Sequence, residues 1–360
     1  MVRGALDEHF GTLHPKQRQA LSLVVFAVLL TRTLSLSAMG REAAAELGRD
    51  PCHTIKQIDR TLSSSTVGVW TLWQLWAAWL LMDAQGVVIA IDWTSLQCDQ
   101  TRVLWAGLCT HDGRTIPLLA LAIHARHLKR RQTQMEARLV ARLRELIPHG
   151  VRAVILADRG FDGYAFRAWV AAHGLHFVVR IRGNLKVAAQ GKSGRARSFC
   201  PKRGEPPRRF RDVQITAKGY GGAHRVTAWA KDAKDPWILV TDLDAEAADV
   251  CGLYALRFRI EEMLRDLKNV TFGLGLEPVA IGSIERCEKL LFAVSVAYTF
   301  QRRVGQLARE RGLAKRFSTR KGRGERHSTF SLGQFHVKAS PALFVEALQT
   351  LNRLDFITPP

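Results

Sequence analysis

The sequence GVVIAID, at residues 86–92, decides the fold, because it is a short continuous apolar run that ends in a carboxylate. Such a run is typical of a strand that is buried on both faces of a sheet. A second run, VRAVILAD at residues 151–158, has the same form and also ends in aspartate. Side chains at the ends of adjacent strands meet at one edge of a sheet, so Asp92 and Asp158 are predicted to lie close together. Either aspartate could instead simply cap a following helix.

The neighbouring residues predict a mixed sheet covered by helices, and hence an α/β fold. Residues 86–181 would form the first part of this core, and residues 244–305 would form its remainder. Further strands are expected at residues 102–109, 115–123 and 176–181, and helices at residues 133–147, 164–173, 246–268 and 283–311.

The regions outside this core differ from it in composition. Residues 1–85 are expected to form a helical DNA-binding region. Its helices at residues 37–47 and 54–62 form either a helix-turn-helix or part of an ordinary small bundle. Residues 182–243 are expected to form a basic β-strand insertion, because positions 180–218 hold 12 Lys or Arg and two acids. Residues 306–360 are expected to form a basic C-terminal region with a helix near residues 342–354.

The charge of the chain indicates a polyanionic partner. Lys and Arg number 53 against 32 Asp and Glu, which gives a formal net charge of +21. Such an excess destabilises a compact protein by self-repulsion unless nucleic acid, or alternatively an anionic membrane surface, neutralises it. The apolar stretches at residues 21–30 and 67–82 are shorter than the ~20 residues that a membrane span needs, so no membrane insertion is expected. The six cysteines form no CxxC pair and the first 15 residues lack the apolar run of a signal peptide, so a cytoplasmic protein is expected.

A third acid is predicted on a helix, within YALRFRIEEMLRDLK at residues 254–268. At 3.6 residues per turn, one stripe of this helix carries Tyr254, Arg257, Glu261, Arg265 and Lys268. The neighbouring Glu262 points away from that stripe. The alternative is an ordinary solvated face, on which an Arg257–Glu261 pair contributes only a few tenths of a kcal/mol, roughly.

Asp92, Asp158 and Glu261 have the chemistry of a divalent metal site. Clustered carboxylates repel one another and raise each other's pKa values unless a cation lies between them. Magnesium, with manganese as a possible substitute, suits this role because it prefers oxygen ligands and keeps positions open for water and phosphate. Of two such ions, one would activate the attacking water or 3′-hydroxyl and the other would stabilise the leaving oxygen. The basic residues of the same helix would hold flanking phosphates.

Taken together, these motifs resemble the DDE transposases of bacterial insertion sequences, specifically the insertion-sequence-four-like group marked by Tyr-x2-Arg-x3-Glu-x6-Lys. That signature is complete here as Tyr254, Arg257, Glu261 and Lys268, and the blocks IDWT at residues 91–94 and ADRGFD at residues 157–162 match those around the first two acids. The resemblance covers roughly residues 86–300. It implies a ribonuclease-H-like catalytic core with a β-strand insertion between the second aspartate and the glutamate. Phe258 departs from the tryptophan that the family often has after the arginine.

The resemblance also implies roles and partners. The segment PWILVT, at residues 236–241, matches the place where family members carry an aromatic that stacks on a flipped base. Trp237 is therefore a candidate for that role, with core packing as the alternative. Catalysis and metal binding would fall to Asp92, Asp158 and Glu261, and DNA binding to Tyr254, Arg257, Arg265, Lys268 and Trp237. The partner would be double-stranded DNA, both element ends and target, bound by a homodimer.

The predicted function is therefore that of a transposase, which cuts the ends of its own mobile element and joins them to target DNA. One alternative is a ribonuclease-H-like nuclease or resolvase that cleaves without strand transfer. A second is a non-catalytic DNA-binding repressor left by a degenerate element, although the presence of all three acids favours an active enzyme.

Overall fold

The computed structural model describes residues 2–96, 100–215, 220–228, 235–279, 282–314, 327–351 and 354–359, and for 220–228 the backbone alone. Within these ranges ten strands form one sheet, in the order β3-β2-β1-β4-β5-β10-β9-β8-β6-β7. β1 pairs in parallel with β4, and β4 with β5, whereas the other neighbours are antiparallel. The strands are β1 Gly86–Leu96, β2 Thr101–Cys109, β3 Thr115–His124, β4 Arg152–Ala157, β5 His176–Arg180, β6 Lys186–Ala189, β7 Lys192–Arg195, β8 Arg208–Ile215, β9 Tyr220–Ala228 and β10 Trp237–Thr241.

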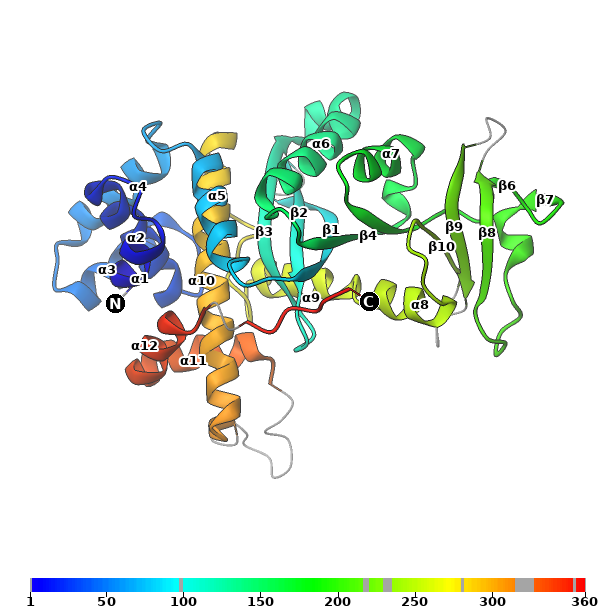
Figure 1. Cartoon of the computed structure of the whole chain (residues 1–360). Coiled ribbons are helices and arrows are strands. Elements are labelled where there is room, and N and C mark those ends of the chain that lie inside the picture. The colour runs from blue at the N-terminus through cyan, green and yellow to red at the C-terminus, as the bar shows by residue number, and fades with distance from the viewer. Residues whose placement is uncertain are drawn as a thin grey trace.

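The helices lie at the two ends of the chain and on both sides of the sheet (Figure 1). No helix within the described ranges is both long enough and apolar enough to cross a membrane. The α-helices are α1 Val2–His9, α2 Pro15–Leu30, α3 Leu36–Leu47, α4 Pro51–Ser63, α5 Val69–Leu80, α6 Ala125–Leu146, α7 Tyr164–Ala172, α8 Ala247–Ala255, α9 Phe258–Lys268, α10 Ile284–Glu310, α11 Thr329–Ala339 and α12 Pro341–Gln349, and the short 3₁₀ helices are η1 Arg159–Phe161 and η2 Ala196–Phe199.

The expected α/β class with a mixed central sheet is confirmed. The apolar run before Asp92 forms the buried first half of β1, where the residues from Gly86 to Ile91 are all enclosed. The second run forms β4, of which every residue after Arg152 is buried. Continuous apolar sequence predicts such strands because both of their faces are covered.

Helices α6 and α9 cover opposite faces of β1. Consecutive residues of a strand point to opposite faces. Trp93 donates its indole N–H to Glu136 of α6, at 3.4 Å, whereas the next residue, Thr94, accepts a hydrogen bond from Lys268 of α9, at 3.3 Å. Asp92 is one residue before Trp93, so it faces α9.

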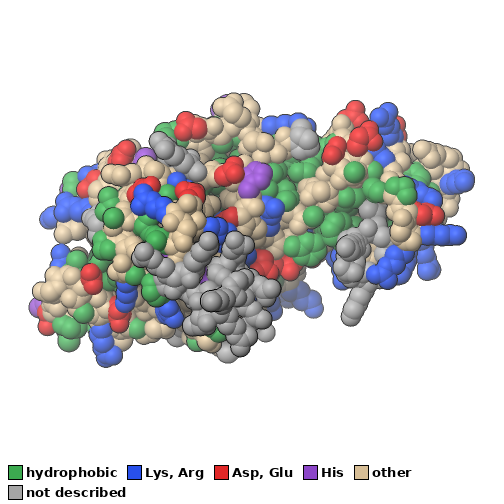
Figure 2. All heavy atoms as spheres, turned by 90° about the horizontal axis from the view of Figure 1, so that it is seen from below, with side chains coloured by type: hydrophobic (Ala, Val, Ile, Leu, Met, Phe, Trp, Pro, Cys, Tyr) green, Lys and Arg blue, Asp and Glu red, His purple; other side chains and the backbone are tan. Residues whose placement is uncertain are grey.

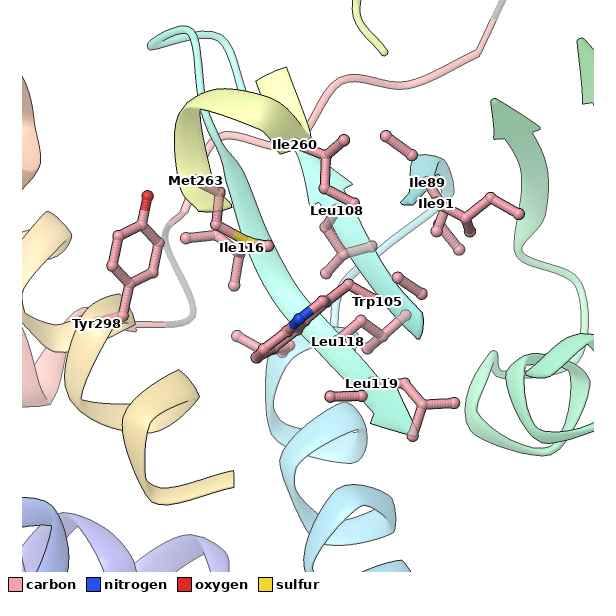
Figure 3. Packing of buried hydrophobic residues seen from close by; sticks show 14 of the residues in the cluster. Ile89, Ile91, Trp105, Leu108, Ile116, Leu118, Leu119, Ile260, Met263 and Tyr298 are labelled. Atoms are coloured by element: carbon pink, nitrogen blue, oxygen red, sulfur yellow. The ribbon is translucent and has the colours of Figure 1, made fainter. Parts of the chain in front are cut away.

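Apolar packing holds α9 against β1, β2 and β3. Ile260 and Met263 point from the helix toward Leu108 and Ile116 of the sheet (Figure 3). Leu264 and Leu267 are also buried. This buried stripe leaves the other side of α9 free to carry charged residues.

The single helix predicted at residues 246–268 is interrupted, and that prediction was wrong. The chain forms α8 and α9, joined by a tighter turn in which the N–H of Arg257 donates to the carbonyl of Tyr254 and that of Ile260 to Arg257. These i to i+3 bonds are typical of a 3₁₀ turn rather than an α-helix. Arg257 keeps helical angles, with φ −53° and ψ −37°. Neither glycine nor proline is present at residues 255–258, so the sequence gives no signal for the break.

The helix α11 was not predicted from the sequence. Its position depends on close contact between its backbone and that of α10. A Cβ added to Gly305 of α10 would lie 1.7 Å from the carbonyl oxygen of Thr329, and one added to Gly333 of α11 would lie 1.6 Å from that of Gln301. Only glycine allows such a crossing. The helix predicted at residues 342–354 is the shorter α12, which Pro341 begins.

The helix at residues 133–147 also begins earlier than predicted, at Ala125. Its first turns, ARHLKRRQ, carry few apolar side chains, so the 3.6-residue pattern is weak there. In the N-terminal region, α3 and α4 cross closely, because a Cβ on Gly40 would lie 2.2 Å from Cγ1 of Ile55. That crossing is compatible with a helix-turn-helix and with a small bundle alike.

Candidate active site

Asp92 lies inside a strand rather than at its end, which corrects the expectation from the sequence. The parallel pairing of β1 with β4 stops at Ala90 and Leu156, but β1 continues beside β2, where Asp92 pairs with Trp105. Asp158 directly follows β4, and its Oδ1 accepts a hydrogen bond of 2.7 Å from the N–H of Gly160. Both aspartates therefore lie just beyond the carboxyl end of the parallel pair, the edge at which open sheets place their sites.

Glu261 reaches this edge from α9. It lies on the exposed side of the helix, with 47% of its side chain exposed. Two polar contacts fix the helix besides its apolar stripe. Arg114 Nε, at the start of β3, lies 2.8 Å from Oδ2 of Asp266, and Arg259 donates to the carbonyl of Thr110.

Arg257 joins two of the three acids. Its Nη2 lies 2.5 Å from Oε1 of Glu261, and its Nη1 lies 3.9 Å from Oδ2 of Asp92. The side chain is only 7% exposed, although the acids themselves are 47% and 23% exposed. Its guanidinium carbon also lies 4.4 Å from the ring centroid of Phe258, a distance typical of a cation–π contact.

The pKa of Asp92 reflects burial, Arg257 and the other two acids. Burial raises the pKa of Asp92 to about 6, Arg257 lowers it, and the charges of Asp158 and Glu261 raise it further. Although burial alone would lower the pKa of Arg257, its contacts with Tyr254, Glu261 and Asp92 raise it, so this residue stays charged. Arg257 thus offsets part of the repulsion between Asp92 and Glu261.

An aromatic group flanks Arg257 on the side of the insertion. The ring of Trp237 lies 5.0 Å from that of Tyr254, in an edge-on arrangement, and stacks on that of Phe258 at 6.0 Å. Tyr254 is fully buried, whereas Trp237 is half-buried and Phe258 is 39% exposed. Trp237 therefore contacts one buried and one exposed ring, and both base stacking and core packing stay open as its role.

Lys268 and Arg265 belong to the same helix but have different surroundings. Lys268 Nζ lies 2.7 Å from Oε2 of Glu277 and 3.3 Å from Oγ1 of Thr94. Arg265 is 65% exposed and pairs with Glu262 at 2.8 Å. An open groove of about 530 Å³ runs along these side chains and is lined by Asp92, Trp93, Thr94, Glu261, Leu264, Arg265, Lys268, Asn269, Val270 and Glu277.

The carboxylates fit a divalent cation by their chemistry, although they do not enclose a site as they stand. Across the described part of the chain, no three His, Cys, Asp or Glu side chains converge closely enough to hold an ion. The donors are nevertheless carboxylate oxygens, which Mg²⁺ prefers, and their mutual repulsion is the condition that such an ion relieves. Arg257, whose buried Nε has no hydrogen-bond partner among the described residues, is the cation that now lies between Asp92 and Glu261.

A comparison with protein families matches the part of the chain that carries these residues. The family described as the transposase DDE domain matches residues 83–298. The chain belongs to this family. The match covers the sheet from β1 to β10 together with α8, α9 and most of α10. No curated protein matches the chain.

Membership in the DDE transposase family explains why these elements meet. The matched residues run from the strand with Asp92 through to the helix after Glu261, so both of them and Asp158 fall inside the family domain. Transposases of this family act on DNA and generally use divalent metals. The insertion-sequence-four-like subgroup stays a prediction that rests on Tyr254, Arg257, Glu261 and Lys268.

Two residues of the groove that contact Lys268 were not predicted from the sequence as site residues. Thr94 follows Asp92 by two positions, and the alternation of a strand places both on the same face, so that signal was present. Glu277 pairs with Lys268 from a loop after α9, and no spacing rule connects these two positions. Only the fold brings that acid into the groove.

Proposed function

We propose that Asp92, Asp158 and Glu261 form the catalytic and metal-binding centre of a transposase that cleaves the ends of its mobile element and joins them to target DNA. The observation that supports it most is the position of Arg257, 3.9 Å from Asp92 and 2.5 Å from Glu261, at an edge where burial raises the pKa of Asp92 to about 6. Asp92 and Glu261 also line an open groove, and Asp158 follows the strand that pairs with the strand of Asp92, which supports the proposal.

The residues of the chain supply most of what the reaction needs. When bound by these carboxylates, two Mg²⁺ or Mn²⁺ ions would activate the attacking oxygen and stabilise the leaving one. Asp92 must lose its proton to become a ligand, which its pKa allows at neutral pH. Arg257 must leave part of its contact with Glu261, and its charge then becomes available for a DNA phosphate.

Basic and aromatic side chains would position the DNA. We assign phosphate contacts to Arg257, Arg265 and Lys268, which lie at the start of α9 or on it. Tyr254 is fully buried beside Trp237, so we assign it a packing role instead of the predicted DNA contact. Trp237 would stack on a flipped base, with Phe258 as the second ring of the stack. Phe258 is 39% exposed, so a DNA base could cover its ring at the end of the stack.

The proposal extends to the organisation of the chain. Residues 86–181 and 244–305 would form a ribonuclease-H-like catalytic core, interrupted by the β-strand insertion at residues 182–243. Residues 1–85 would bind the terminal repeat, and the basic residues 306–360 would contact further phosphates. The transposase would act as a homodimer, because two element ends must meet in one complex.

The test is cleavage of a duplex that carries the element's terminal repeat, with Mg²⁺ and with EDTA. Wild type should cut in Mg²⁺ alone. Asp92→Asn, Asp158→Asn and Glu261→Gln should each reduce cleavage about 100-fold or more while they keep DNA binding. Glu262→Gln is the matched control, because it removes a neighbouring acid of α9 that pairs with Arg265.

Other outcomes point to the alternatives. Cleavage without joining of a supplied target duplex would indicate a nuclease or resolvase. Tight binding without cleavage in any divalent ion would indicate a repressor. Equal losses in Glu262→Gln and Glu261→Gln would contradict the assignment of the third acid.

A further inference from the structure

A second concavity, of about 340 Å³, lies between the residue after Asp158 and the strands of the insertion. Arginine is the commonest residue in its lining, with Arg159, Arg180, Arg182, Arg195 and Arg197. In the view from below, Lys and Arg side chains also gather at the end of the molecule formed by β6, β7 and β8 (Figure 2). The lining of the pocket is therefore strongly basic, and it includes the residue next to Asp158.

The pocket is built by the backbone and has an apolar floor. Ile181 and Ile238 line it and are each only 2% exposed. The N–H of Arg197 donates to the carbonyl of Gly183 at 3.0 Å, and that of Ile181 to the carbonyl of Ile238 at 2.8 Å. These hydrogen bonds fix η2 and β10 to the segment that follows β5.

Gly183 leaves the space that the pocket needs. A Cβ on this residue would lie 3.3 Å from Cβ of Arg197 and 3.4 Å from Cδ1 of Ile238. Both contacts are tight, so any larger side chain would narrow the pocket or displace its wall.

The pocket has more positive than negative charge. Arg182 makes two bonds to buried Asp162, of 2.6 and 2.7 Å, and Arg197 lies 3.7 Å from Asp235. Arg159 and Arg195 are exposed, and neither has a carboxylate partner within the described ranges. Several guanidinium groups around an apolar floor repel one another and favour an anion between them.

We propose that this pocket binds a phosphodiester group of the DNA backbone, on the insertion side of the cleavage site. Guanidinium forks match the oxygens of a phosphate, and unpaired arginines do not have to give up an internal partner to bind one. The position follows from Arg159, which is adjacent in the chain to Asp158. The proposal rests on the function proposed above, because it takes Asp158 as part of the cleavage centre.

Binding of a fluorescein-labelled 30-base-pair duplex of arbitrary sequence, measured by anisotropy in EDTA, tests the proposal without cleavage. In Arg159→Gln/Arg195→Gln, we expect the Kd to rise about three- to tenfold near 0.1 M salt. The slope of log K against log salt should become shallower by about 1, because the pocket is proposed to hold one phosphate. Arg208→Gln, on the same insertion but paired with Glu205 at 2.7 Å, is the control and should change neither value.

Two further variants separate the pocket from general charge and from misfolding. Arg159→Lys/Arg195→Lys keeps both charges and should recover most of the salt slope. Gly183→Val keeps every arginine but narrows the pocket, and should weaken binding. A thermal melting curve like that of wild type is required of each variant.

The outcomes separate this proposal from the function on which it rests. A wild type that binds no duplex would contradict both. Wild-type binding with an unchanged Kd and salt slope in the pocket variants, or equal losses in Arg208→Gln, would overturn the pocket alone. If inorganic phosphate raised the melting temperature of wild type but not of the variants, and duplex binding were unaffected, the pocket would be a site for free phosphate instead.

Discussion

Arg257 and Glu261 are joined by a hydrogen-bonded ion pair of 2.5 Å at the start of α9, and the arginine is almost completely buried while the glutamate is not. The guanidinium extends from there toward Asp92, at 3.9 Å. An i,i+4 pair on an exposed helix is worth only about 0.3–0.5 kcal/mol. This pair differs, because its cation also lies near the half-buried Asp92 and lowers the pKa of that aspartate.

Replacement of Arg257 should change the pH dependence of metal binding. Arg257 is the main influence that lowers the pKa of Asp92, so Arg257→Gln should raise that pKa above its value of about 6. Mn²⁺ binding, followed by electron paramagnetic resonance between pH 5 and 8, should then have a higher midpoint pH than in wild type. Arg265→Gln serves as the control, and an equal midpoint in all three proteins would show that Arg257 does not act on Asp92.

Removal of the Asp92 charge should stabilise the metal-free protein. The pKa of Asp92 is raised from 3.8 to about 6 in the folded state, so the folded chain holds this proton more tightly than the unfolded chain does. Stability is therefore lost as the pH rises from about 4 to about 6, and the loss persists above pH 6. Asp92→Asn should be more stable than wild type by about 2–3 kcal/mol at pH 7.5, and the difference should shrink at pH 4.

Urea unfolding in EDTA at the two pH values measures this difference. A less stable Asp92→Asn at pH 7.5 would mean that the ionised carboxylate is satisfied by its surroundings.

The pair formed by Arg114 and Asp266 should anchor the helix that carries Glu261. Their side chains are 18% and 11% exposed, and Tyr298 also donates to Asp266, at 3.3 Å. Arg114→Ala should destabilise the fold by about 2–3 kcal/mol, because it leaves a largely buried carboxylate without its cation. Chemical unfolding of this variant, of Asp266→Asn and of the double variant gives the coupling energy. Additive effects would show that the two residues do not interact.

The crossing of α10 and α11 should not tolerate a methyl group. Gly305→Ala would bring Cβ within 1.7 Å of the Thr329 carbonyl oxygen, so we expect a loss of about 3 kcal/mol or more in the free energy of unfolding. Gly252→Ala in α8 is the control, since nothing lies within 4 Å of its added Cβ. That change should stabilise the protein slightly, by about 0.5–1 kcal/mol, as alanine does in a helix. Similar effects of the two variants would contradict the close crossing.

Substitution of Trp237 by alanine or by phenylalanine should distinguish a role in base stacking from a role in packing. Trp237→Ala should weaken binding of a duplex with an unpaired terminal base by about 1–3 kcal/mol, whereas Trp237→Phe should keep most of that affinity. Fluorescence of 2-aminopurine at the unpaired position reports the stacking directly. If Trp237→Ala lowers only the melting temperature of the protein and leaves the fluorescence unchanged, the residue has a packing role alone.

The elements that carry the candidate residues could be predicted in part from local sequence. The apolar runs before Asp92 and Asp158 specify buried strands because an uninterrupted apolar stretch must be covered on both faces. The spacing of Tyr254, Arg257 and Glu261 predicts one side of a single helix. The structure differs, because the chain forms two helices and Tyr254 is buried on α8 whereas Glu261 is 47% exposed on α9.

The sequence by itself therefore determined the α/β class and the types of element that carry the acids, because these depend on hydrophobic periodicity along the chain. Only the tertiary structure decided that β1 continues past Asp92 beside β2, that Arg257 lies between two acids, and that Glu277 reaches Lys268. Each of these depends on contacts between residues far apart in sequence, or on one backbone approaching another. Such contacts are set by how the elements pack together, and no periodicity within a single segment encodes them.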